Sequence, residues 1–126
     1  MSRPSSHPGA ELALVAVGGA LGSLARWGLA EALPSATGTL VANVSGCFAI
    51  GVLAAWLFVA HPRLRLLVGV GFLGGYTTFS THLLEAHGLL DRPGPAAAYV
   101  GGTLVGCRAA AAAGTVLGRR LPGASA

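Results

Sequence analysis

The sequence predicts an all-α integral membrane protein, organised as one domain of four transmembrane helices over residues 1–126. Hydrophobic residues make up 53% of the chain, charged residues only 10%, and 20 of the 126 residues are glycine. This composition is too apolar for the surface of a small soluble domain. Four apolar stretches also approach the roughly 20 helical residues that cross a hydrocarbon core of about 30 Å.

Segments that carry proline, glycine or charge, where helices stop, separate the predicted spans. The spans are residues 12–33, 40–60, 66–90 and 96–118, with a polar N-terminal tail over residues 1–10 and a C-terminal tail over residues 119–126. A soluble four-helix bundle is the alternative, but it requires a charged face on each helix, and the second span has no charged residue. A cleaved signal sequence is disfavoured because the first apolar run is long for that role and three spans follow.

The first span contains two glycines four residues apart, Gly18 and Gly22, a spacing that lets another helix approach closely. It also contains Arg26, about 10 Å from the end of the span by helical rise. A charge inside a membrane usually faces a partner, a cavity or an interface. We therefore expect Arg26 to have a structural role at an interface rather than to contact an ion.

The second span is uncharged and contains one amide side chain, Asn43. Taken alone, this amide could form a hydrogen bond between helices or donate to a ligand. Cys47 in this span and Cys107 in the fourth span fit no metal-site or disulfide spacing. The two cysteines are therefore expected to be small packing residues.

The third span contains the most unusual segment of the chain, residues 69–81, with four glycines, three threonines and one serine. Such residues loosen a helix and place polar groups where no water is available, and this cost suggests a site. Gly69, Gly71 and Gly74 match the GxGxxG dinucleotide pattern, but that pattern requires a βαβ unit and is rejected inside a membrane span. Neither HExxH nor GxSxG occurs in the sequence, so it does not predict an enzyme.

The close-packing glycine spacing continues along the third and fourth spans. Three further pairs lie four residues apart: Gly71 and Gly75, Gly102 and Gly106, and Gly114 and Gly118. Packing within the chain accounts for some of these pairs. A single layer of four short helices can hardly enclose a solvated path, however, and this favours an oligomer. Arg108, near the middle of the fourth span, has no evident partner in the sequence.

The basic residues are all arginines, and their placement predicts the orientation of the chain. With four spans, the N-terminus, the middle loop and the C-terminus share one side of the membrane, which holds five arginines against one on the other side. The five are Arg3, Arg63, Arg65, Arg119 and Arg120, and the one is Arg92. Because arginine-rich segments stay in the cytoplasm, both termini are expected there. Without interleaved aromatic residues, these arginines do not indicate nucleic-acid binding.

Three sequence blocks resemble the motifs of the Fluc family, small fluoride channels of microbial membranes. The blocks are GGALGSLARW at residues 18–27, GTLVANVSGCFAIG at residues 38–51 and GFLGGYTTFSTH at residues 71–82. They occur in the order and spacing of the family, on three of the four predicted spans. Together they make the resemblance specific, whereas any one block alone would be weak.

The resemblance implies an antiparallel dimer of four-helix subunits, with two narrow fluoride pores and a third helix that is broken at its centre. It also implies a structural sodium ion as the cofactor, buried at the dimer centre. In the family, backbone carbonyls at positions that match Gly74 and Thr77 contribute to this ion site. Backbone oxygens freed by a helix break can coordinate a cation in this way.

Pore positions of the family match Asn43, Phe79, Ser80 and Thr81 in this chain. Fluoride is small and strongly hydrated, so a pore must replace its water with hydrogen-bond donors or positive partial charges. An amide, two hydroxyls and the electropositive edge of a phenylalanine ring can supply them. A weakly polar track, where the family places such residues, continues with Tyr99, Thr103 and Cys107.

His82 departs from the family pattern TTFSTF, which has a second phenylalanine at this place. Histidine is also aromatic, but it adds an N–H donor and a proton that titrates near neutrality. His82 could bind fluoride differently or mark a pore that no longer conducts. Some Fluc channels combine two different subunits, each inserted in one orientation, with one degenerate pore. The arginine bias fits that arrangement better than a dual-topology homodimer.

The resemblance thus implies a passive, fluoride-selective channel in the cell membrane of a microbe, which lowers cytoplasmic fluoride by letting the anion leave. Its partners would be fluoride, the lipid bilayer and a second Fluc-type subunit, either the same chain or a homologue. The alternative is a non-conducting structural or accessory subunit of a heterodimeric channel. A proton-coupled transporter is disfavoured because the acids lie toward the span ends, at Glu11, Glu31, Glu85 and Asp91.

Overall fold

The computed structural model describes residues 7–123, and its regular secondary structure over that range is entirely helical. The elements are α1 (Pro8–Ala32), α2 (Ser35–Trp56), α3 (Pro62–Leu64), the π-helix η1 (Arg65–Leu73), α4 (Gly74–Tyr76), α5 (Ser80–His87) and α6 (Pro93–Arg120). The predicted all-α class is confirmed. Residues 1–6 of the predicted N-terminal tail, with Arg3, and residues 124–126 of the C-terminal tail lie outside the described residues.

Three of the helices within residues 7–123 are long and apolar enough to cross a membrane, namely α1, α2 and α6. The predicted third span corresponds to an interrupted helical stretch over residues 62–87, the divided segment. Helical residues run from 62 to 76 through α3, η1 and α4, residues 77–79 are not helical, and α5 follows. Each part is shorter than the roughly 20 residues of a bilayer crossing. A total of four spans therefore stays a prediction.

Prolines set the beginnings of the helices. α1, α3 and α6 each have proline in the first turn, where the missing N–H is not needed. Pro34 stands at the N-cap of α2 with an extended ψ of 141°. The helix begins at Ser35, before the predicted start of the second membrane span at Leu40. Gly38, taken as a helix stop, instead donates its N–H to the carbonyl of Pro34 at 2.8 Å and continues the helix.

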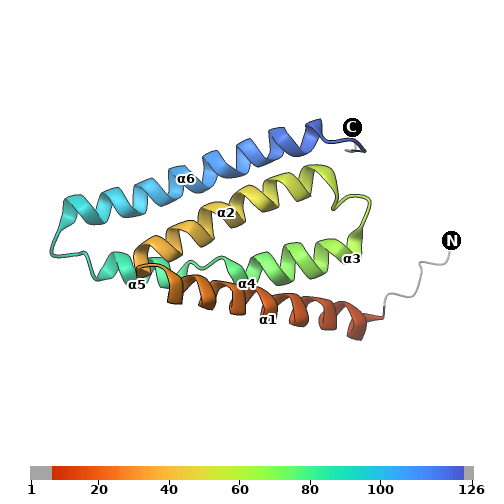
Figure 1. Ribbon diagram of the computed structural model, residues 1–126, viewed down its shortest axis with the longest axis horizontal. Coiled ribbons are helices and arrows are strands. Elements are labelled where there is room, and N and C mark those ends of the chain that lie inside the picture. The colour runs from red at the N-terminus through yellow and green to blue at the C-terminus, as the bar shows by residue number, and fades with distance from the viewer. Residues whose placement is uncertain (1–6, 124–126) are drawn as a thin grey trace.

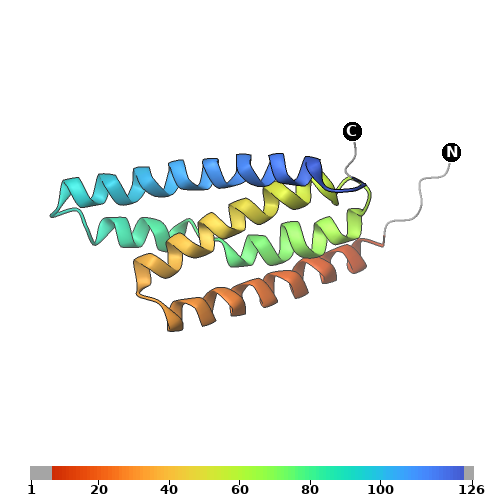
Figure 2. The same cartoon turned by 45° about the horizontal axis from the view of Figure 1, so that its top comes forward.

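The helices pack mainly as two pairs (Figure 1). α1 lies along η1 and α4, while α2 lies along α6, and α5 contacts both α2 and α6. The turned view in Figure 2 shows the same pairing, with α6 running beside α2 and α1 beside the first part of the divided segment. The start of α1, the turn from α2 to α3 and the end of α6 lie at the same end of the bundle.

Glycines bring α1 against the first part of the divided segment. A Cβ atom on Gly18 or Gly22 would overlap main-chain atoms of η1 and α4. A Cβ atom on Gly71 would lie 2.8 Å from the carbonyl oxygen of Val15, and one on Gly75 would lie 3.0 Å from the hydroxyl of Ser23. No other residue type fits such an approach without moving backbone. These predicted packing glycines therefore join helices of the same chain.

The remaining glycine pairs behave differently from each other. Gly114 and Gly118 meet the α2 backbone at Phe48 and Val52, as close packing predicts. At Gly102, in contrast, a Cβ would have no atom within 4 Å, and at Gly106 it would make an ordinary contact with Val44 at 3.5 Å. Gly102 and Gly106 therefore make no close helix contact within the described chain, and their close packing against a second subunit stays a prediction.

The outer surface of the bundle is apolar. Large hydrophobic side chains are strongly exposed, among them Leu12 at 70%, Val105 at 69% and Trp27 at 63%. Buried hydrophobic residues are few among the described ones, and they include Ala42 and Leu73. A soluble domain rarely exposes such contiguous apolar surface, whereas lipid or a partner subunit covers it readily. The structure thus agrees with a membrane protein.

Candidate functional site

The divided segment opens at Thr77, where the backbone leaves the helix with φ −80° and ψ 153°. The N–H and the hydroxyl of Thr77 both donate to the carbonyl of Leu73, at 3.0 and 2.9 Å. The N–H bond of Thr77 is the last helical bond of α4. The helix α5 begins at Ser80, so residues 77–79 form a non-helical segment in the middle of the bundle.

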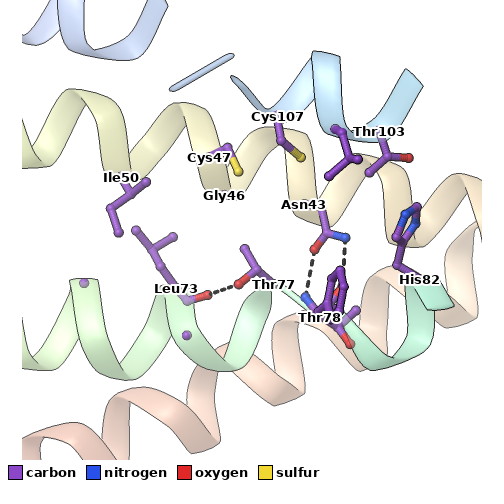
Figure 3. Close-up of a pocket in the computed structure, with 14 residues that line it drawn as sticks. Asn43, Gly46, Cys47, Ile50, Leu73, Thr77, Thr78, His82, Thr103 and Cys107 are labelled. Carbon is purple, nitrogen blue, oxygen red and sulfur yellow. Dashed lines mark hydrogen bonds between the residues drawn. The ribbon is translucent and has the colours of Figure 1, made fainter. Parts of the chain in front are cut away.

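Asn43 of α2 holds the open segment in place (Figure 3). Its Nδ2 donates to the carbonyl oxygen of Thr78 at 2.8 Å, and its Oδ1 accepts from the N–H of Thr78 at 2.8 Å. Asn43 is only 8% exposed, and such a pair satisfies backbone groups that neither helix nor water would serve. The residue predicted for a pore is therefore also the brace of the break.

The bond to Asn43 frees a carbonyl on α4. In an uninterrupted helix the N–H of Thr78 would donate to the carbonyl of Gly74, but here it donates to Asn43. Likewise, the N–H of Thr81, the usual donor to Thr77, donates to the hydroxyl of Thr78 at 3.3 Å. The carbonyls of Gly74 and Thr77 have thus lost their ordinary helical donors. These are the two residues that the resemblance assigns to a cation.

The hydroxyls of the predicted pore gather at the start of α5. The Thr78 hydroxyl donates to that of Thr81 at 3.0 Å and lies 3.4 Å from that of Ser80. Together with the Thr81 N–H contact, this arrangement caps the first turn of α5. Ser80 and Thr81 therefore lie beside the break, and their hydroxyls are partly engaged with it.

A pocket of about 390 Å³ lies between α2, α6 and the divided segment. Six of the predicted site residues line it: Asn43, Gly74, Thr77, Phe79, His82 and Thr103. Ser80, Thr81, Tyr99 and Arg26 are not among its lining residues. Cys47 and Cys107, expected to be packing residues, also line the pocket, from α2 and α6 (Figure 3).

His82 is the most enclosed polar side chain of the pocket, with 3% exposure. Its ring lies against Tyr99, with centroids 4.7 Å apart, and 6.5 Å from the ring of Phe79. Phe79 itself is 68% exposed, so it forms the outer edge of the aromatic group. Neither ring nitrogen of His82 has a hydrogen-bond partner within the described part of the chain.

The hydroxyls of Tyr99 and Thr103, in the predicted track of the fourth span, both donate hydrogen bonds within the chain. The hydroxyl of Tyr99 donates to Glu85 of α5. The hydroxyl of Thr103 donates back to the carbonyl of Tyr99 at 2.7 Å, although the residue is buried and lines the pocket. Thr103 therefore presents mainly its methyl group and oxygen lone pairs, rather than a free O–H, to the cavity.

Sequence reasoning missed a polar cluster around Glu85. Ser35 and Thr39 donate to its Oε1 at 2.5 and 2.9 Å, and Tyr99 donates to its Oε2. The three donors come from α2 and α6, far apart in the chain. Ser35 and Thr39 lie between the first two predicted spans, where hydroxyl residues commonly mark turns, so only the position of Glu85 three residues after His82 could have marked this cluster. The cluster lies at the α5 end of the pocket.

Arg26 of α1 contacts the helical part that precedes the break. Its Nε donates to the carbonyl of Gly75 at 3.1 Å, which joins α1 to α4. Gly75, like Gly74, lies within four residues of the non-helical segment, where carbonyls lack their usual helical donors. The arginine therefore contacts backbone within its own chain. Arg108 is exposed on α6.

Comparison with known proteins places these features in a family. The model of a family described as CrcB-like protein, Camphor Resistance (CrcB), matches residues 13–115, which include the break, Asn43 and the pocket. The chain belongs to the CrcB family. The matched region extends from α1 to the last turns of α6.

Relatives cover most of the chain and carry one kind of name. The fluoride-specific ion channel FluC 2 of Nocardia farcinica is 43% identical over 133 aligned positions, which cover 94% of this chain and 91% of the relative. FluC 2 of Thermobifida fusca is 45% identical, covering 86% of this chain and 91% of the relative. FluC of Anaeromyxobacter dehalogenans is 44% identical, with 90% and 99% covered. The predicted membership of this family of channels, which are not enzymes, is confirmed.

Proposed function

We propose that the chain is a subunit of a passive, fluoride-selective channel that lowers cytoplasmic fluoride. The observation that carries the proposal is the junction of Asn43 with the break of the divided segment, because it places a few polar groups in a mostly apolar pocket in the middle of the bundle. Relatives that cover this junction are named fluoride-specific ion channels. A cavity of this type can pass an anion without any catalytic group.

The pocket offers fluoride the kind of contacts that must replace its water. The Asn43 amide has a second N–H beyond the one given to Thr78, and the Phe79 ring presents an electropositive edge. Next along the path come the imidazole of His82 and the residues of the track, Tyr99 and Thr103, whose hydroxyls donate within the chain and would have to turn to reach fluoride. Ser80 and Thr81 complete the path at the break. No described acid lines the pocket, which favours an anion over a cation.

The working unit in this proposal is an antiparallel dimer of four-span subunits, with the third span interrupted at residues 77–79. One supporting observation is that Gly74 and Phe79, which line the pocket, are exposed on the single chain. A second subunit would cover that open side. The second subunit is either the same chain or a homologue.

Sodium would be the structural ion of that dimer. The residues fit such an ion, because the carbonyls of Gly74 and Thr77 have lost their helical donors and oxygen ligands suit a hard cation. When bound, sodium would neutralise these carbonyl dipoles and join the subunits. The two carbonyl oxygens of one chain are too few for a complete coordination shell of sodium, so a second subunit would supply the remaining oxygen ligands.

An accessory, non-conducting subunit is the second candidate. It is favoured by His82 at the place of a family phenylalanine, and by the charge distribution. Arg63, Arg65, Arg119 and Arg120 lie at the bundle end where α1 begins, whereas Arg92 lies at the other end. This bias supports cytoplasmic termini in the microbial cell membrane and a single orientation, which an antiparallel homodimer cannot use.

A fluoride-efflux assay with the purified chain alone in liposomes separates the two candidates. Fluoride release on addition of a potassium ionophore, without equal release of chloride, is expected of a channel. A sealed liposome that becomes permeable only when a second Fluc-type subunit is reconstituted would instead assign the accessory role. Topology reporters fused at the C-terminus supply the independent check, since activity on both sides of the membrane would exclude a single orientation.

A further inference from the structure

His82 is a buried histidine whose hydrogen-bonding groups are unused by the protein. It is 3% exposed, and neither Nδ1 nor Nε2 has a partner within the described residues. Burying a polar group without a hydrogen bond costs free energy, so such groups usually meet a bound molecule or serve a function. His82 lines the pocket, and Figure 3 shows its ring pointing from α5 toward Thr103 of α6.

The hydroxyl groups nearest to His82 are already engaged elsewhere. The hydroxyl of Tyr99 donates to Glu85 and the hydroxyl of Thr103 donates to a backbone carbonyl, while Asn43 has given one of its two N–H groups to Thr78. The rings of Phe79 and Tyr99 flank the imidazole and offer it no conventional hydrogen bond. An N–H of His82 is consequently a donor left for a molecule inside the pocket.

We propose that His82 is an anion-binding donor of the pocket, and that fluoride binds more tightly when the imidazole is protonated. This inference rests on the proposed function and adds a specificity residue to it. A neutral imidazole carries one N–H, whereas the imidazolium carries two donors and a positive charge. Inside an apolar bundle an anion and an imidazolium attract each other far more strongly than in water. A phenylalanine edge at this place would give no dependence on pH.

Other titratable groups around His82 must be separated from it. Tyr99 faces it from α6, and Glu85 lies one turn further along α5. Cys47 of α2 and Cys107 of α6 line the same pocket. The lining residues from η1, α4 and the break carry no ionisable side chain. Glu85, which is held by three hydroxyl donors, is therefore the main competing source of a pH effect.

The direct test is a fluoride titration of the detergent-purified full chain labelled with ¹⁵N-histidine, followed by NMR at several pH values. The His82 signal is assigned by its loss in His82→Phe. We expect fluoride, but not chloride, to shift this signal, with an affinity about tenfold higher near pH 6 than near pH 8. The exposed His87 on the same helix serves as the internal control and should not respond to fluoride. A His82 signal that ignores fluoride at every pH would overturn the proposal.

Flux measurements give a second, independent reading. His82→Gln keeps an N–H donor without the titration, so it should retain fluoride affinity near that of the neutral wild type and lose the pH dependence. Glu85→Gln should keep the pH dependence. Loss of the pH dependence in Glu85→Gln, with retention in His82→Gln, would assign the effect to Glu85 and refute the role of His82. Failure of the channel function would appear differently, as absent flux in the wild type despite a fluoride-responsive His82 signal.

Discussion

The two parts of the divided segment are held in the bundle by different kinds of contact. Residues 62–76 lie against α1 through glycines, with backbone meeting backbone and little side-chain chemistry. α5 is held by polar contacts, through Glu85 and the hydroxyls of Ser35, Thr39 and Tyr99. Within the one predicted third span, residues 62–76 are thus held by close backbone packing, whereas α5 is held by hydrogen bonds. Substitutions should therefore damage folding in the first part and function in the second.

The largest effect is expected at the glycine contact. Gly22→Leu places a Cβ on main-chain atoms of Phe72 and Tyr76, neither of which can move without displacing η1 and α4. We expect a loss of about 3 kcal/mol or more in the free energy of unfolding, or no folded protein at all. Gly28→Leu on the same helix is the matched control, because nothing lies within 4 Å of its Cβ position. Thermal unfolding in detergent measures both, and equal stability of the two variants would contradict the packing.

The junction between the two parts depends on Asn43. Asn43→Ala removes both bonds to Thr78 and leaves its N–H and carbonyl unpaired, at an expected cost of about 2 kcal/mol or more. Asn43→Asp keeps an acceptor for the Thr78 N–H, but it sets a carboxylate oxygen against the Thr78 carbonyl and buries a charge, so it should be destabilised at least as much. It also places a negative charge on the proposed fluoride path. We expect both variants to lose fluoride efflux from liposomes and to unfold more easily than the wild type. Wild-type stability of Asn43→Ala would count against the brace.

A substitution of Phe79, at the outer edge of the aromatic group, should affect function with little effect on folding. Phe79 is 68% exposed, so Phe79→Ile should change the unfolding free energy by less than about 0.5 kcal/mol. The isoleucine lacks the electropositive ring edge, and fluoride efflux should fall at least about tenfold. Leu84→Ile, at an equally exposed site of α5 outside the pocket, is the control. Unchanged efflux in Phe79→Ile would remove this ring from the path.

The sequence predicted the shape-determined part of the molecule better than the hydrogen-bonded part. Composition predicted the helical class, and glycine spacing predicted the contacts of Gly18 and Gly22 because close packing leaves a local signature. The same spacing does not state which helix a glycine faces, and Gly102 has no neighbour within 4 Å of its Cβ position in the described chain. The bonds of Asn43 and Glu85 could not be predicted either. Asn43 and Thr78 are 35 residues apart in the sequence, and Glu85 is still further from Ser35 and Thr39. Only the tertiary structure brings these residues together.

The smallest effect on function is expected at Thr77, where the helix ends. Thr77→Ala removes the hydroxyl bond to Leu73 but keeps the Thr77 N–H bond to the same carbonyl, so we expect a loss of only about 1 kcal/mol. The proposed sodium ligand is the backbone carbonyl, which alanine retains. Sodium should therefore stabilise the variant dimer as much as it stabilises the wild type, measured by dimer dissociation in sodium against N-methyl-glucamine. Loss of the sodium effect in Thr77→Ala would assign the ion to the hydroxyl, and no sodium effect in the wild type would remove the ion from the dimer altogether.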